Sequence, residues 1–297
     1  MHIRNDYKRI IFANNVDLGE DIKIDPRTRI VCDTIKIDDG TVILGSSKIE
    51  CRECRIGKNN FLNDVMIEGS LNAGNTRIQI GDDNLFLQNT RLNCNEKITI
   101  GNDVNIGQNV KIWTHASSMD VFNGYPFTLK SVEIGSHIWI TADTTILPGV
   151  KIGSNVIIGN MSLVNKNIPD GCFAAGIPIK IIKENIYPKV LSFKDKKAIL
   201  EDCIEQYYEL LKFKHFLPNV HLKENLKIEF CIDDCITIFD CENRKISGDI
   251  NEYSEDFRDF LRYRGIKLFT GKPFQSIKPA WFICAIERNT NPDHGEK

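Results

Sequence analysis

The stretch Ser131–Val164 reads SVEIGSHIWITADTTILPGVKIGSNVIIGNMSLV, and an aliphatic residue returns at every sixth position within it. These positions are Ile134, Ile140, Ile146, Ile152, Ile158 and Val164. A step of six matches neither the 3.6-residue turn of an amphipathic helix nor the two-residue alternation of a strand. The stretch therefore predicts a repeat architecture.

The same step of six recurs upstream, with interruptions. It runs through Ile80, Phe86 and Leu92 and again through Ile100, Ile106 and Ile112, whereas Ile37, Ile43, Ile56 and Leu62 suggest less regular coils. Two additional residues separate Ile80 from Ile100, and many more separate Ile112 from Ile134. A three-sided solenoid accounts for the rhythm, because three hexads close one coil and coils stack about 4.8 Å apart. Aliphatic side chains then point inward, and Gly, Asn or Asp relieves the backbone at the corners.

The segment from Ile78 to Lys183 resembles the hexapeptide-repeat acyltransferases. Relatives typically close with a pattern like IGDNVWIG…ILPGV…IGAGSVVTKDIP…AGNPAKVIR, and here the segment reads IGSHIWITADTTILPGVKIGSNVIIGNMSLVNKNIPDGCFAAGIPIKIIK. The resemblance implies a mainly β fold, a left-handed parallel β-helix of hexapeptide repeats over residues 1–187. Irregular coils are expected over 1–77 and an inserted loop at about 113–132, followed by a small C-terminal α+β domain over 188–297.

A single histidine, His115, stands where the inserted loop begins, in VKIWTHASSMD. A neutral imidazole there could take a proton from an acceptor as it attacks a thioester, and the resemblance implies this role of general base. The alternative is a histidine that only bonds a neighbouring coil. Ser117 replaces the second histidine that many relatives carry, and the group that orients His115 stays unassigned, with Asp120 nearby in sequence. His137 is expected at a surface corner.

The resemblance also implies an acetyl-coenzyme A site. The positions that match the family's cofactor-binding residues are Trp139, Thr141, Ala142, Asn160, Lys166, Lys180 and Lys183. Asn160 and Met161 stand where relatives have Ala-Gly, and the lysines could pair with phosphates or simply be solvated. Relatives form trimers, so a homotrimer with active sites at subunit boundaries is expected.

The composition excludes several other classes. The formal charge of -2 argues against general nucleic-acid binding, which needs a basic surface. The chain has no run of eighteen apolar residues and its first residues lack a signal-peptide core, so we expect a cytoplasmic protein without a membrane span. Its ten cysteines, including the Cys51–Cys54 pair, are expected to be buried thiols rather than zinc ligands. No metal is expected.

The six-residue step disappears after Tyr187. A helix is predicted over 192–213 with Ser192 as its N-cap, then a hairpin of 226–233 and 235–242 turning at Asp233–Asp234, then a helix within 255–265 and a strand. The aromatic residues Tyr253, Phe257, Phe260, Tyr263, Phe274, Trp281 and Phe282 are expected mostly in a core. A sheet that exposes some of them to a sugar or a partner enzyme is the alternative.

The resemblance implies an acetyl-coenzyme A-dependent O-acetyltransferase acting on a sugar hydroxyl, with a surface polysaccharide or O-antigen precursor as the acceptor and His115 as the base. Two alternatives stay open. One is N-acetylation of an amino-sugar nucleotide, and the other is a non-catalytic β-helix scaffold whose C-terminal domain contacts partners.

Overall fold

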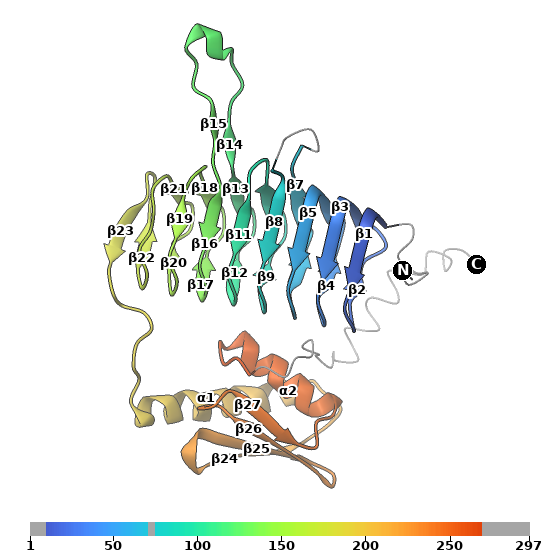
Figure 1. Ribbon diagram of the computed structural model, residues 1–297. Coiled ribbons are helices and arrows are strands. Elements are labelled where there is room, and N and C mark those ends of the chain that lie inside the picture. The colour runs from blue at the N-terminus through green and yellow to red at the C-terminus, as the bar shows by residue number, and fades with distance from the viewer. Residues whose placement is uncertain (1–9, 71–74, 269–297) are drawn as a thin grey trace, which may run out of the picture. The chain divides into compact units, whose positions relative to one another are not determined.

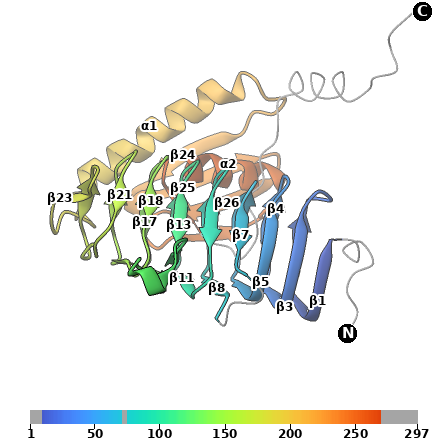
Figure 2. The ribbon, with the colours of Figure 1, turned by 90° about the horizontal axis from the view of Figure 1, so that it is seen from above.

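The computed structural model describes residues 10–70 and 75–268. The chain divides into two compact units, Met1–Lys189 and Val190–Lys297. The first is a left-handed β-helix whose parallel strands stack coil upon coil, as Figures 1 and 2 show. The second is a small α+β unit.

Three faces make up the β-helix, and each later coil contributes one short strand to each face. Face 1 contains β8 (Arg77–Ile80), β11 (Ile98–Ile100), β16 (Val132–Ile134) and β19 (Lys151–Ile152). Face 2 contains β2 (Lys23–Ile24), β4 (Val42–Leu44), β6 (Phe61–Asn63), β9 (Leu85–Phe86), β12 (Val104–Ile106), β17 (Ile138–Ile140), β20 (Ile157–Ile158) and β22 (Phe173–Ala175). Face 3 contains β7 (Met66–Glu68), β10 (Arg91–Asn93), β13 (Lys111–Trp113), β18 (Thr145–Ile146) and β21 (Leu163–Val164).

The repeat predicted from sequence sets the register of these faces. Ile106, Ile140 and Ile158 lie directly above one another on face 2, and Ile112, Ile146 and Val164 do so on face 3. All six side chains are almost completely buried. Burying each such side chain contributes about 1.5–3 kcal/mol, so the inward stacks hold successive coils in register.

The first coils differ from the expected hexads. β1 (Ile11–Leu18), β3 (Arg29–Ile37) and β5 (Lys48–Ile56) are long strands, and β5 pairs with β7 of face 3 and with β8 of face 1. The chain therefore passes from face 3 to face 1 without breaking its strand, which explains why the sequence step is less regular there.

Two corners of the later coils are traversed very differently. The corner between face 2 and face 3, here called the regular corner, keeps the step of six from Phe86 to Leu92 and in every later coil. The corner between face 3 and face 1, here called the insertion corner, is lengthened in three successive coils, at 69–76, 94–97 and 114–131.

The last of these insertions forms an arm. β14 (His115–Ala116) and β15 (Thr128–Leu129) pair antiparallel and carry the 3-10 helix η2 (Val121–Asn123) at their tip. Figure 1 shows this green arm projecting away from the coils. The loop expected at 113–132 is thus a two-stranded ribbon at its base. The β-helix ends where β23 (Lys180–Lys183) pairs antiparallel with β22.

The second unit confirms the first predicted helix and the hairpin. α1 (Phe193–Leu211) begins after Ser192, whose hydroxyl accepts the backbone N–H of Asp195. A four-stranded antiparallel sheet contains β24 (Asn219–Lys223), β25 (Lys227–Ile232), β26 (Cys235–Asp240) and β27 (Lys245–Gly248), with η3 (Glu224–Leu226) between the first two. β24 and β27 were not predicted because both are short and largely polar.

The second predicted helix is shifted. α2 (Glu252–Tyr263) is capped by Asn251 and begins three residues before Glu255, the expected start. Phe257 and Phe260 are buried against Tyr207, as expected, whereas Tyr263 is 68% exposed. The strand predicted next, together with Phe274, Trp281 and Phe282, lies outside the described residues.

Candidate active site

His115 stands at the insertion corner, directly after face 3 ends. It opens the arm in β14, and its imidazole is half-buried above the coil that carries Asn93 and Asn95. The imidazole Nδ1 lies 2.7 Å from Asn93 Oδ1 and 3.2 Å from Asn95 Nδ2. Two amide side chains therefore compete for one ring nitrogen.

The contacts of the Asn93 and Asn95 side chains favour one tautomer of the His115 imidazole. Asn95 Oδ1 accepts the backbone N–H of Ser70 at 2.8 Å, so the Asn95 amino group faces His115. Nδ1 cannot both accept from Asn95 and donate to Asn93. The shorter contact, to Asn93 Oδ1, favours a proton on Nδ1. Nε2 then carries the lone pair and can accept a proton.

Sequence reasoning left the orienting group of His115 unassigned, and in the structure Asn93 Oδ1 is the oxygen in contact with its Nδ1. Asn93 lies directly beneath Trp113 in the register of β10 and β13. The signal was present in the sequence, because the two additional residues between Ile80 and Ile100 fall at this corner and bring Asn95 under His115. Asp120 instead caps η2 by accepting the backbone N–H of Phe122 at 2.9 Å.

Two neighbours fix the chain on either side of His115. Thr114 is fully buried, and its Oγ1 donates to the Asn93 carbonyl at 2.8 Å and accepts the Glu96 N–H at 3.0 Å. The Trp113 ring meets the imidazole edge-on, with 6.1 Å between centroids. The histidine thus rests on a hydrogen-bonded coil beside an aromatic side chain.

The regular corner holds Thr141, Ala142 and Asn160, where the chain leaves face 2. Coils approach closely here, since a Cβ built on Gly107 would lie 2.7 Å from the Ala142 nitrogen. Thr141 turns its hydroxyl inward to the Ile158 carbonyl at 2.7 Å, whereas Asn160 is exposed. Thr141 and Ala142 are half-buried small residues at this corner, and Asn160 and Met161 beside them are exposed.

Trp139, Lys180 and Lys183 extend this region over the end of face 2. Trp139 and Lys183 line one pocket of about 410 Å³ together with Ile157, Phe173, Ile186, Tyr187 and Lys189. Lys180 on β23 lies opposite Ala175, and β23 is two strands beyond β20 on face 2. The structure therefore groups Trp139 with the predicted phosphate-binding lysine Lys183.

Lys166 falls elsewhere. It follows β21 at the insertion corner, on the same edge of face 3 as His115. The predicted residues thus form two sets within one chain. His115 and Lys166 lie where face 3 ends, and Thr141, Ala142 and Asn160 lie where it begins.

His137 lies at a corner with a positive φ of 58°. Its exposed Nδ1 is 3.1 Å from Asp103 Oδ2. This geometry is that of a corner residue paired across two coils.

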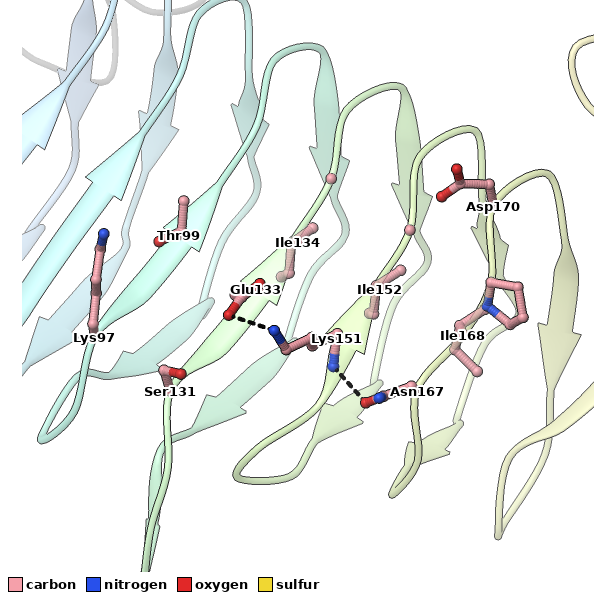
Figure 3. A pocket seen from close by; sticks show the side chains of 13 residues that line it. Lys97, Thr99, Ser131, Glu133, Ile134, Lys151, Ile152, Asn167, Ile168 and Asp170 are labelled. Carbon is pink, nitrogen blue, oxygen red and sulfur yellow. Dashed lines mark hydrogen bonds and ion pairs between the residues drawn. The ribbon is translucent and has the colours of Figure 1, made fainter.

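A larger hollow, of about 710 Å³, lies on face 1 (Figure 3). Glu133 and Lys151 project into it and pair at 3.0 Å, and Lys151 donates its backbone N–H to Asn167 Oδ1 at 2.9 Å. None of the predicted site residues lines it. Lys97 and Asp170 also line it, on opposite sides of the Glu133–Lys151 pair.

The cysteines of the first coils lie inside the β-helix. Cys32, Cys51, Cys54 and Cys94 are buried, and the sulfurs of Cys32 and Cys51 are 3.9 Å apart. Contact with the Cys32 thiol and with neighbouring thiols raises the pKa of Cys51, so it stays protonated. Among residues 10–70 and 75–268, no group of three or more His, Cys, Asp or Glu side chains could hold a metal ion.

The same described ranges contain no helix that is both long and apolar enough to cross a bilayer.

Comparison with known proteins shows similarity to hexapeptide-repeat transferases. The family described as bacterial transferase hexapeptide (six repeats) matches residues 131–166. The chain is 37% identical to the galactoside O-acetyltransferase of Escherichia coli over 104 residues, 34% of this chain and 51% of that protein. It is 35% identical to the galactoside O-acetyltransferase of Lactococcus lactis over 128 residues, 42% of this chain and 60% of that protein.

The alignment with a third relative covers most of that protein. Protein CapG of Staphylococcus aureus is 36% identical over 145 residues, which are 46% of this chain and 84% of that protein. The chain spans about half the length of the leading curated relatives it matches.

Proposed function

We propose that this chain, which belongs to the hexapeptide-repeat acetyltransferase family, transfers the acetyl group of acetyl-coenzyme A to a sugar hydroxyl. The acceptor is a precursor of a surface polysaccharide or O-antigen, modified in the cytoplasm. The observation that carries the proposal is the 2.7 Å contact from His115 Nδ1 to Asn93 Oδ1, which leaves Nε2 as a proton acceptor.

The chemistry requires one base and no covalent intermediate. The sugar hydroxyl oxygen attacks the thioester carbonyl carbon while His115 Nε2 takes the hydroxyl proton. The carbon–sulfur bond then breaks, and the coenzyme A thiolate leaves and takes that proton. The products are an acetyl ester and free coenzyme A. General-base assistance of this kind contributes about 10²–10⁴-fold in rate.

The donor lies along the regular corner in this proposal. The small, half-buried side chains of Thr141 and Ala142 suit a narrow pantetheine arm, and exposed Asn160 can donate a hydrogen bond to it. Trp139 and Lys183 share a pocket that suits the nucleotide end. Lys180 and Lys166 supply further cations for its phosphates.

The two sets of residues require a second copy of the chain. His115 and Ala142 lie at opposite ends of the same face, so the base of one copy meets a donor held at the regular corner of another. A closed ring of three copies gives three equivalent sites. A homotrimer is therefore part of the proposal.

Hydroxyl rather than amine acceptors are favoured by the site and by relatives. A hydroxyl is a weak nucleophile that needs a positioned base as it attacks, and two relatives are named galactoside O-acetyltransferases. Asn160 and Met161, which replace smaller residues of the family pattern, instead favour a non-catalytic scaffold. The experiment below separates these possibilities.

Thiol release from acetyl-coenzyme A, measured with a panel of sugars and amino-sugar nucleotides, tests the function. We expect turnover with hydroxyl acceptors, reduced at least about 10²-fold in His115→Ala, while calorimetry shows unchanged acetyl-coenzyme A binding. His137→Ala is the matched control and should retain turnover. A native chain that fails to bind acetyl-coenzyme A would support the scaffold, and unchanged turnover in His115→Ala would remove His115 as the base.

A further inference from the structure

We infer that the outer surface of β13 is an acceptor subsite that binds an anionic saccharide. The sugar ring stacks on Trp113, and Lys111 pairs with its negative charge. The inference rests on the proposed function only for the reaction at His115. Binding of the saccharide can be measured without turnover.

The alternation of β13 places the two side chains together. Ile112 points inward and is fully buried, so Lys111 and Trp113 point outward on the same face. Alternate residues of a strand are about 7 Å apart, close to the span of a pyranose ring with one substituent. Trp113 lies between Lys111 and His115 in the chain. Its indole therefore has a cation on one side and the proposed base on the other.

Trp113 is placed to hold a ring beside the base. Its indole contacts the imidazole edge-on at 6.1 Å and is only half-buried. An aromatic face offers a large apolar surface with few rotatable bonds. The C–H face of a pyranose stacked on it would direct a ring hydroxyl toward His115 Nε2.

The charged side chains of face 3 below Trp113, from β5 to β13, leave one cation in excess, because Lys48, Arg91 and Lys111 are matched only by Glu50 and Glu68. Glu68 on the face 3 strand two coils below pairs with Lys48 at 3.3 Å and lies 4.0 Å from Arg91. Lys111 lies directly above Arg91 in the register and is exposed. Within the described ranges Lys111 makes no ion pair.

The register gives Lys111 one charged neighbour, Arg91, in the coil below. Thr145 lies above Lys111, and Asn93 lies beneath Trp113. Arg91 approaches Glu68, so Lys111 is the cation of this column that lies on the strand leading to His115 without a carboxylate beside it in the described ranges. A carboxylate or a phosphate would satisfy it equally, so the shared chemistry is a single anionic group on a sugar.

Three matched probes test the subsite by ligand-observed saturation-transfer NMR and by thiol release. They are methyl β-galactoside, galacturonate and galactose 6-phosphate. We expect the native chain to bind the two anionic sugars about three- to tenfold more tightly than the neutral one. Trp113→Ala should weaken all three by about tenfold, and Trp113→Phe should restore part of the loss.

Lys111→Gln should abolish the preference for the anionic sugars and leave binding of the neutral sugar unchanged. Lys111→Arg should keep the preference, and Lys151→Gln on face 1 is the matched control that should alter nothing. Unchanged sugar affinity in Trp113→Ala, equal affinity of the native chain for all three probes, or no binding of any of them would overturn the subsite.

The donor offers a separate source of negative charge. A rise in the KM for acetyl-coenzyme A in Lys111→Gln, without a change for sugars, would assign Lys111 to the donor and overturn the inference. Sugar binding as expected but without acetyl transfer would leave the subsite standing and refute the proposed function.

Discussion

The regular corner and the insertion corner border the same face of one β-helix, yet they provide opposite kinds of surface. At the regular corner the step of six never fails beyond Phe86, and coils approach so closely that Gly107 has no room for a Cβ. At the insertion corner three successive coils are lengthened, and the extra residues carry Asn95 and His115. The unbroken repeat leaves short, closely stacked turns at one corner, whereas the lengthened turns of the other corner bring His115, Asn93 and Asn95 together.

The largest predicted effect is on turnover, and it tests whether the insertion corner of one copy and the regular corner of another form one active site. His115→Ala removes the base, and Ala142→Trp fills the donor corner, so each variant alone should lose about 10³-fold in turnover. Co-expressing the two should restore about a quarter of native turnover, because one site in four combines an intact base with an intact donor corner from different chains.

The recovery is measured as thiol release from purified mixed oligomers. Co-expression of His115→Ala with a chain that carries both substitutions is the control and should stay inactive. Mixed oligomers that remain as inactive as either parent would place both corners of one site in a single chain.

The next effect concerns the orientation of His115 at the insertion corner. Asn93→Leu removes the acceptor 2.7 Å from Nδ1, and loss of such an orienting partner should lower kcat by about 10–100-fold. Asn93→Asp should retain activity but move the acidic limb of the kcat/KM profile to higher pH, since a carboxylate favours the charged imidazolium. A pH profile identical to native in Asn93→Asp would show that Asn93 does not act through His115.

The sequence predicted most of the β-helix because each hexad is a local rule repeated many times. The register from Ile80 to Val164 and the insertion near His115 follow from the six-residue spacing, and the turn at Asp233–Asp234 follows from the alternating residues on either side of it. The pairing of β14 with β15 was not predicted. The long strand β5 escaped prediction because rounding a corner without a break erases the six-residue signal. Asn93 escaped because its role depends on a contact 22 residues away in sequence.

The sequence also did not show that the residues predicted to bind the donor lie at two separate edges of face 3. Lys166 and Asn160 are neighbours in the chain, but the six-residue step carries them to opposite ends of face 3. Residues that form one continuous sequence motif therefore lie on two different surfaces of the β-helix. Only the stacking of coils shows which residues share an edge.

A smaller expected effect, on the free energy of unfolding, concerns the buried threonine at each corner. Thr114 and Thr144 are both fully buried threonines, at the insertion and regular corners respectively. Thr114 Oγ1 accepts the Glu96 N–H at 3.0 Å, whereas Thr144 Oγ1 makes one contact, to the Gly159 carbonyl at 3.4 Å. Thr114→Val should lower the free energy of unfolding by about 1–3 kcal/mol because that N–H loses its partner.

Thr144→Val is the matched variant, and it should cost less than Thr114→Val. Chemical denaturation of the two purified variants, compared with the native chain, measures the difference. Equal losses would mean that the lengthened corner gains no particular support from Thr114.

The smallest effect distinguishes which copy supplies Lys166. Lys166→Gln should raise the KM for acetyl-coenzyme A by about three- to tenfold, with no rise for the analogue that lacks the 3'-phosphate. Because Lys166 shares an edge with His115, its charge should reach the donor held by the neighbouring copy. In the mixed oligomers, Lys166→Gln on the chain with intact His115 should raise the KM, and the same change on the His115→Ala chain should not. The reverse pattern would assign the lysine to the copy that holds the donor and would contradict the division of face 3 into two edges.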